Sequence, residues 1–182
     1  MGWQPQDELA QSVALEVLLH GPVGRSELAR RLSLAPATLT RISADLIASG
    51  LLTEVRTTRT GTSGRPSIPL AVVADSHHFL GIKVADDCLT AAVINLKAQV
   101  LSYDQLPLPT HSPKDVAQGI ATLARQAEKS FRIDAIGVGI GGVVTDQGII
   151  RSAPFLEWED VDLVGLVREY TKIPVFVANE IG

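Results

Sequence analysis

The stretch SELARRLSLAPATLTRISADLIASGLL, Ser26–Leu52, contains two helical patterns separated by a short turn. Apolar residues recur at helical spacing in residues 25–32 and again after Pro36. Proline suits the first turn of a helix because the N–H that it lacks has no intrahelical partner there. Gly50 is well placed as the C-cap of the second helix. The side chains expected to face the core are Leu28, Ala29, Leu32, Leu39, Ile42, Leu46 and Ile47.

A helix before this stretch and a hairpin after it complete a recognisable order of elements. Residues 7–20 carry a broad apolar stripe at helical spacing. The stripe consists of Leu9, Val13, Leu15, Val17 and Leu18. Leu51–Val55 and Ser67–Val73 have the composition of two paired strands. Three helices followed by a hairpin are the arrangement of a winged helix-turn-helix, so residues 1–75 are expected to form a DNA-binding domain.

The first half of the second helix in the quoted stretch is expected to expose small and hydrogen-bonding side chains. Such side chains fit the major groove of B-DNA, where they contact base edges and phosphates. An arginine at this position could read a guanine edge, and threonines could contact phosphates or bases. The candidate DNA-contacting residues of this helix are Pro36, Ala37, Thr38, Thr40 and Arg41.

The loop between the two expected strands is basic and rich in hydroxyl groups, and it would form the wing. Arginines there can approach phosphates or a minor groove, and hydroxyls can donate to phosphate oxygens. The candidate contacts are Arg56, Arg59, Thr60 and Arg65. Two alternatives stay open: a solvated hairpin loop without a partner, and a winged helix that binds protein instead of DNA.

Charge is distributed unevenly along the 182 residues, whose net charge is −4. Residues 21–70 hold seven arginines against three carboxylates, whereas residues 71–182 hold nine basic and fourteen acidic side chains. Such asymmetry indicates a basic module joined to an acidic one. A single cysteine, Cys88, excludes an intrachain disulfide and fits a reducing cytoplasm. The start of the chain lacks the pattern of a signal peptide, and no apolar run is long enough for a membrane span, so a cytoplasmic protein is expected.

The remaining residues, 76–182, predict a second domain with the element order β-β-β-α-β-α-β. Three consecutive strands come first, and an amphipathic helix follows in residues 112–130 with Ser112 as N-cap. Residues 133–145 read as a buried strand that runs into a glycine-rich turn. A further helix is expected in residues 158–171, and a last strand follows it. A meander followed by α/β units fits half of an actin-like, ribonuclease-H-like fold.

Four stretches in this order resemble the ROK family of repressors and sugar kinases. They are the quoted helix pair, the wing ending SGRPSIPLAV, the sheet opening FLGIKVADDCLTAAVINL, and IGVGIGGVVTDQGIIRSAPFLEWEDVDL followed by IPVFVANE. The resemblance implies an α/β protein in which a helical head with a β-wing precedes the first lobe of an actin-like ROK domain. The second lobe and a zinc-binding segment of the family would lie beyond Gly182, so the chain is expected to be a fragment or a shortened gene product.

The resemblance also places the residues on which kinase chemistry would depend. Family kinases carry an acidic residue and a Gly-Gly-Thr turn that cradles ATP phosphates, whereas the corresponding residues here are Lys83 and Ala85-Asp86-Asp87. Two carboxylates at this place would repel phosphate. The family's Asn-Asp pair, whose Asp is the catalytic base, corresponds to Asn179-Glu180. Phe155 replaces a sugar-contacting Asn, and Gly141 replaces the Pro of the family's Gly-x-Pro-Gly turn.

The expected protein is therefore a kinase-inactive ROK regulator, with repression of sugar-related genes as its expected role. Its expected partners are a double-stranded DNA operator, a second copy of the chain and a sugar-like effector, with no cofactor, bound metal or membrane. The candidate effector residues are Gly141, Gly142, Asn179 and Glu180. Two alternatives remain: a ROK sugar kinase with a DNA-binding head, and a truncated regulator that binds DNA without effector control.

Overall fold

A computed structural model describes residues 8–55 and 68–180 of the chain. The chain divides into two compact units, Met1–Ser76 and His77–Gly182. The sequence pattern placed the division after residue 75, one residue earlier. A short 3-10 turn, η1 (Ala74–Ser76), ends the first unit.

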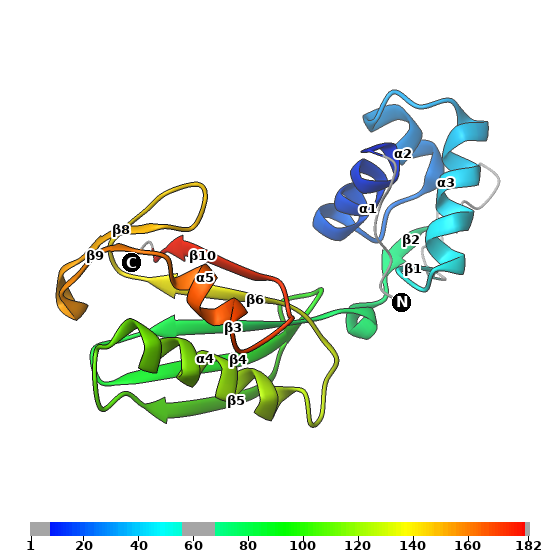
Figure 1. The fold of residues 1–182 in the computed structure, drawn as a ribbon. Helices are drawn as coiled ribbons and strands as arrows, with labels where there is room; N and C mark the ends of the chain where they lie inside the picture. Colours follow the sequence, from blue (N-terminus) through cyan, green and yellow to red (C-terminus); the bar gives the residue numbers. More distant parts are fainter. Residues whose placement is uncertain (1–7, 56–67, 181–182) are drawn as a thin grey trace. The chain divides into compact units, whose positions relative to one another are not determined.

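Within residues 8–55 and 68–76, the first unit has three α-helices and a two-stranded hairpin (Figure 1). The helices are α1 (Glu8–His20), α2 (Arg25–Arg31) and α3 (Pro36–Ala48). The hairpin pairs β1 (Leu52–Glu54) with β2 (Leu70–Val72) in antiparallel register. All three predicted helices are thus present at nearly the predicted positions.

The core of the first unit forms where one face of each helix meets the hairpin. On α3 the buried side chains follow the spacing i, i+3, i+4 and i+7, which places them on one face. The fully or nearly fully buried apolar side chains among the described residues of the unit are Val13, Val17, Leu28, Leu39, Ile42, Leu46, Leu52 and Leu70. The opposite face of α3 is thereby left for solvent or a partner. Ser49 is the C-cap of α3, and the predicted C-cap, Gly50, follows it with φ of +80°.

Two expectations for the first unit were wrong in detail. Of the predicted stripe on α1, Val13 and Val17 are buried, whereas Leu15 is 54% exposed, because apolar residues occur on more than one side of this helix. The second strand begins at Leu70 instead of Ser67, which lies outside the described residues. A bridge from Val23 to Leu70 adds a short third partner to the hairpin.

The second unit is built on a five-stranded mixed sheet with the order β10-β6-β3-β4-β5 (Figure 1). The strands β3 (His78–Val84), β4 (Cys88–Asn95) and β5 (Val100–Pro107) form the predicted antiparallel meander. The strands β6 (Ile133–Ile140) and β10 (Val175–Asn179) lie parallel to β3 and to each other. The carboxyl ends of β3, β6 and β10 therefore meet at one edge of the sheet.

Two helices pack against this sheet and against each other. They are α4 (Pro113–Ala127) and the short α5 (Leu163–Arg168). Alternate residues of the strands point toward these helices, so Leu80, Ile82 and Val84 of β3 are buried in the core. Ser112 is the N-cap of α4, as predicted, although its side chain makes no capping hydrogen bond. No helix in the described part of the chain is long and apolar enough to cross a bilayer.

A small second sheet was missed by the sequence pattern. It has the order β7-β8-β9, with β7 (Val143–Val144), β8 (Ile150–Ala153) and β9 (Trp158–Val161), and η2 (Pro154–Leu156) connects the last two. The helix expected in residues 158–171 is limited to residues 163–168, because residues 158–161 form the strand β9. It is α5 alone, since Asp162 caps its start by accepting a hydrogen bond from Gly165 N at 2.8 Å.

Candidate nucleic-acid interface and effector site

The turn between α2 and α3 is tight and hydrogen-bonded. Ser33 has φ of +52°, in the left-handed region, which reverses the chain directly after α2. Leu34 N donates to Ala29 O at 2.9 Å and fastens the turn to the preceding helix. Ala35 is extended, and Pro36 takes the first position of α3. A short, hydrogen-bonded turn therefore connects α2 to α3.

The N-terminal half of α3 presents the predicted contact residues on its exposed face. Pro36, Ala37, Thr40 and Arg41 are exposed, and Thr38 is half-buried. Their neighbours on the other face belong to the core, so the exposed face is rigidly positioned. The short side chains near the helix start would let another molecule approach the backbone closely.

Two polar side chains on this face already have partners within the helix. The Thr40 hydroxyl donates to the Pro36 carbonyl at 2.8 Å, which leaves its oxygen lone pairs as acceptors. Arg41 Nη1 lies 3.5 Å from Asp45 Oδ2, and the two side chains are 63% and 68% exposed. An ion pair this exposed contributes about 0–1 kcal/mol, so a stronger anion such as a phosphate can displace Asp45.

Three other arginines of the first unit form ion pairs with its glutamates, and two of these arginines join different elements. Arg25 donates to Ser43 Oγ at 3.2 Å and to Glu54 Oε1 at 2.7 Å, which joins α2 to α3 and β1. Arg31 donates to Glu27 and to Glu16 of α1, both at 2.7 Å. Arg30 also pairs with Glu27, at 2.6 Å. Much of the basic charge that the sequence placed in this unit therefore serves internal contacts.

The pairing with two arginines has a consequence for the pH dependence of stability. Hydrogen bonds from Arg30 and then Arg31 lower the pKa of Glu27 from 4.5 to about 2. A depressed folded-state pKa stabilises the fold above the unfolded-state pKa, and this stabilisation is lost as pH falls toward the folded value. We expect Glu27→Gln to lower the melting temperature most near neutral pH, and the difference from wild type to shrink between about pH 4.5 and pH 2.

Thermal unfolding followed by circular dichroism over that pH range measures the difference directly. Glu8→Gln is the matched control, because Glu8 is an exposed helical glutamate for which no ion pair is recorded among the described residues. A Glu27→Gln difference that stayed constant with pH would contradict the assigned role of the carboxylate.

The predicted wing contacts Arg56, Arg59, Thr60 and Arg65 lie outside the described residues. These residues belong to the segment between β1 and β2, and both strands are described. Val55 N, just after β1, donates to Pro69 O, just before β2, at 2.9 Å. The assignment of these four residues to DNA contact remains a prediction.

The candidate effector residues come together at the carboxyl ends of β6 and β10. Glu180 N donates to Ile140 O at 2.9 Å, and Gly142 N donates to Asn179 Oδ1 at 3.4 Å. Glu180 Oε1 also lies 2.6 Å from Nζ of Lys83, at the end of β3. In sheets of this kind, ligands bind outside the carboxyl ends of parallel strands. Lys83 could not be predicted as a member of this site, because its contact with Glu180 depends on the strand register.

Packing accounts for one of the two glycines in this cluster. A Cβ at Gly142 would lie 2.2 Å from the carbonyl oxygen of Ser152, so only glycine lets the β6–β7 turn lie against β8. A Cβ at Gly141 would lie 3.6 Å from the ring of Phe155, an ordinary contact distance. Phe155 therefore stands beside the cluster and fills space that the resemblance assigns to a polar sugar contact.

The β3–β4 turn, which the resemblance places at the phosphates of a kinase, is tied to the segment before α4. His111 Nε2 lies 2.8 Å from Asp86 O and 3.2 Å from Asp86 Oδ1. Leu108 N donates to Asp87 O at 2.8 Å. The carboxylates of Asp86 and Asp87 are both exposed at the turn. A phosphate approaching this turn would meet negative charge.

Comparison with known proteins identifies relatives of both units. A family model described as the ROK family matches residues 79–182. The DNA-binding transcriptional dual regulator NagC of Escherichia coli K12 is 29% identical over 168 residues. The match includes 89% of this chain and 41% of NagC, so the chain spans less than half the length of that relative.

Solved structures resemble the chain in the same way. A crystal structure of a ROK family transcriptional regulator, described as a homologue of the E. coli Mlc protein, superposes with a TM-score of 0.75 at 26% identity. The match includes 94% of this chain and 45% of the chain in that crystal structure. A ROK family glucokinase from Streptomyces griseus, solved with glucose and AMPPNP, superposes with a TM-score of 0.52 at 22% identity. The match includes 56% of this chain and 33% of the glucokinase chain, and it shows a shared fold. Because the family model matches more than half of the residues, this protein belongs to the ROK family.

Proposed function

We propose that the chain is part of a sequence-specific transcriptional regulator whose first unit is a winged helix-turn-helix. The observation that carries the proposal is the exposed face of α3, held by its buried face and by the tight turn after α2. The NagC match supports it, since that match extends over 89% of the chain and the protein is named a DNA-binding regulator. In this arrangement α3 enters the major groove and the β1–β2 loop approaches the DNA backbone.

The contacts divide into two classes. On α3, Arg41 reads a base edge, while Ala37 and Thr40 lie close to bases or phosphates. On the loop between β1 and β2, Arg56, Arg59, Thr60 and Arg65 contact phosphates or the minor groove. One small reading head gives little specificity, so the protein binds a two-fold operator as a homodimer.

The second unit acts as a sensor domain and not as a kinase. Lys83 replaces the acidic residue that the family's kinases carry near ATP, and its ammonium group pairs with Glu180 at 2.6 Å. That pairing holds the carboxylate that would have to accept the sugar's proton. The exposed Asp86 and Asp87 repel phosphate at the turn. The sensor takes a sugar-like effector near Gly141, Gly142, Asn179 and Glu180 and controls genes of sugar metabolism, with repression as the expected sign.

A direct assay separates this reading from the kinase alternative. We expect no sugar-dependent release of ADP from ATP when the protein is incubated with glucose or N-acetylglucosamine in a coupled assay. A ROK glucokinase run beside it checks the coupling enzymes. Turnover above the no-sugar rate that persists through repeated purification would overturn the non-enzymatic assignment.

The proposed DNA readout is tested by selection from a library of random duplexes. The protein is expected to enrich a short motif, repeated with two-fold symmetry at a spacing of about one or two helical turns. A library recovered without enrichment of any sequence would contradict a sequence-specific regulator. The Arg125→Ala variant, altered in α4 of the second unit, serves as the control that should enrich the same motif.

A further inference from the structure

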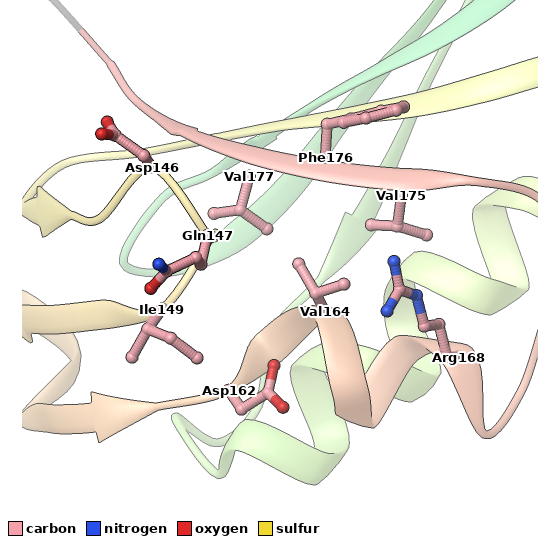
Figure 2. Close-up of a pocket in the computed structure, with 10 residues that line it drawn as sticks. Asp146, Gln147, Ile149, Asp162, Val164, Arg168, Val175, Phe176 and Val177 are labelled. Carbon is pink, nitrogen blue, oxygen red and sulfur yellow. The ribbon is translucent and has the colours of Figure 1, made fainter.

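A cavity of about 350 Å³ lies in the second unit between the β7–β8 turn, α5 and the edge strand β10 (Figure 2). Its volume is near the lower end of the range of about 300–1,000 Å³ that is typical of small-molecule sites. It shares no residue with the candidate effector cluster at Gly141, Gly142, Asn179 and Glu180. The cavity is therefore a separate candidate site.

The floor of the cavity is aliphatic. Val164 of α5 and Val175 and Val177 of β10 line it, and each of these side chains is at least nine-tenths buried by the surrounding protein. Ile149 lines it from the β7–β8 turn. Phe176 of β10 also borders the cavity, but Figure 2 shows its ring on the opposite side of the strand from Val175 and Val177. The floor between the described elements is thus formed by branched aliphatic side chains, which suit a short aliphatic group better than the flat face of a sugar ring.

The polar lining is divided by charge. Figure 2 shows Gln147 and Asp162 on one side of Val164 and Arg168 on the other, with the Arg168 side chain rising from α5 toward β10. Asp162 Oδ1 accepts the capping hydrogen bond from Gly165 N, which leaves Oδ2 for a ligand. Within residues 8–55 and 68–180, no hydrogen bond or ion pair is recorded for the side chains of Gln147 or Arg168. The cavity thus has a cationic end and an acceptor-rich end.

The turn that forms one wall is held by its own hydrogen bonds. Thr145 N donates to Ile149 O at 2.9 Å, and Ile149 N donates to Thr145 Oγ1 at 3.1 Å. Gly148 has φ of +83°, and a Cβ there would lie 3.0 Å from a methyl group of Val164. The turn therefore needs glycine at this position to pack against α5 and hold Gln147 at the cavity.

We propose that this cavity binds a small aliphatic α-amino acid. The ligand's carboxylate pairs with the guanidinium of Arg168, whose fork of donors matches a carboxylate. Its ammonium group lies toward Asp162 Oδ2 and the amide oxygen of Gln147, and its side chain covers the valine floor. Each of the three kinds of lining then has a partner.

The charges of the lining favour a zwitterion over a simple anion. Asp146 and Asp162 both line the cavity, against the single cation of Arg168. A plain carboxylic acid would place its negative charge near two carboxylates with only one cation to offset them. An amino acid also carries an ammonium group, which is attracted to the acceptor-rich end at Asp162 and Gln147. Its carboxylate is attracted to Arg168 at the cationic end, so both ends of the cavity favour binding.

The experiment is a titration of the isotopically labelled protein with L-leucine, followed by two-dimensional NMR. Leucinamide, which lacks the carboxylate, and 4-methylpentanoate, which lacks the ammonium group, are titrated in parallel. We expect L-leucine to bind with a Kd of about 1 mM or below and both analogues to bind about tenfold or more weakly. The shifted resonances should belong to the β7–β8 turn, α5 and β10.

Variants assign the effect to the cavity. Arg168→Gln is expected to weaken L-leucine binding about tenfold or more, because the carboxylate loses a bidentate partner. Arg125→Gln, at an exposed position on α4, keeps the wild-type affinity. A well-dispersed spectrum of each variant verifies that it is folded. The proposal is overturned by no shift at about 10 mM L-leucine, by equal affinity in Arg168→Gln, or by equal binding of 4-methylpentanoate. None of these results bears on DNA binding, so the proposed function is tested independently.

Discussion

Arg41→Ala is expected to relax the preference of the protein for its operator while leaving most of its general affinity for DNA. A bidentate contact between an arginine and a guanine edge discriminates against a wrong base by about 1–3 kcal/mol, or roughly five- to 150-fold. The ion pair of this side chain with Asp45, at 3.5 Å, is exposed and weak, so its loss should affect stability little. The measurement is the ratio of affinities for operator and scrambled duplexes.

Arg59→Ala provides the contrast, although its position lies outside the described residues. A phosphate contact carries no sequence information, so its loss should weaken binding to both duplexes by a similar factor. The slope of log affinity against log salt should also fall by about 1. Equal loss of sequence preference in Arg41→Ala and Arg59→Ala would contradict this division of roles, and Arg125→Ala should behave as wild type in both measurements.

Gly142→Ala is expected to destabilise the second unit strongly. The added Cβ would lie 2.2 Å from Ser152 O and 3.2 Å from Ala153 Cα, and both atoms belong to the backbone of β8. A backbone atom cannot rotate away, so the β6–β7 turn must separate from β8. Overpacking of this kind costs about 1–3 kcal/mol, and the backbone clash places this variant at the upper end.

Gly137→Ala is the matched control for that change. Gly137 lies within β6, and a Cβ there would meet nothing within 4 Å. Thermal unfolding should show a drop of about 10 °C in the melting temperature of the second unit for Gly142→Ala and little change for Gly137→Ala. Similar melting temperatures for the two variants would show that the turn does not pack against β8 as described.

Long, strongly patterned elements could be predicted from sequence. The apolar spacing of Leu39, Ile42 and Leu46 indicates a helix with one buried face, and the structure has α3 there. In α4, Pro113 follows the N-cap and the buried residues recur at helical spacing. Local pattern and tertiary packing agree in these elements, so the local signal is sufficient.

Short elements could not be predicted, because tertiary contacts decide them. The strand β7 has two residues, Val143–Val144, too few for any periodicity. The strand β9, Trp158–Val161, pairs with β8. No Gly or Pro separates this strand from α5, so the sequence gives no signal for the boundary between them. On α1, Leu15 belongs to the apolar pattern and is nevertheless exposed. The spacing of apolar residues in a sequence does not show which of them pack against another element.

The candidate sites divide in the same way. Residues near one another in sequence, such as Pro36–Arg41 on α3, could be grouped by helical geometry alone. The contact of Lys83 with Glu180 joins residues nearly a hundred positions apart, and it follows from the parallel register of β3, β6 and β10. The cavity between α5 and β10 depends on the packing of three separate elements, so no local motif indicates it.

The most direct test of the central claim is the anisotropy of a labelled duplex, taken from upstream of the protein's own gene, titrated with the protein. A scrambled duplex of the same composition is measured beside it over a series of salt concentrations. A sequence-specific regulator predicts tighter binding to the native duplex, with an affinity that falls steeply as salt rises, because basic side chains release counterions from the phosphates. Equal, weak binding to both duplexes at every salt concentration would contradict the assignment of α3 as a DNA-reading helix.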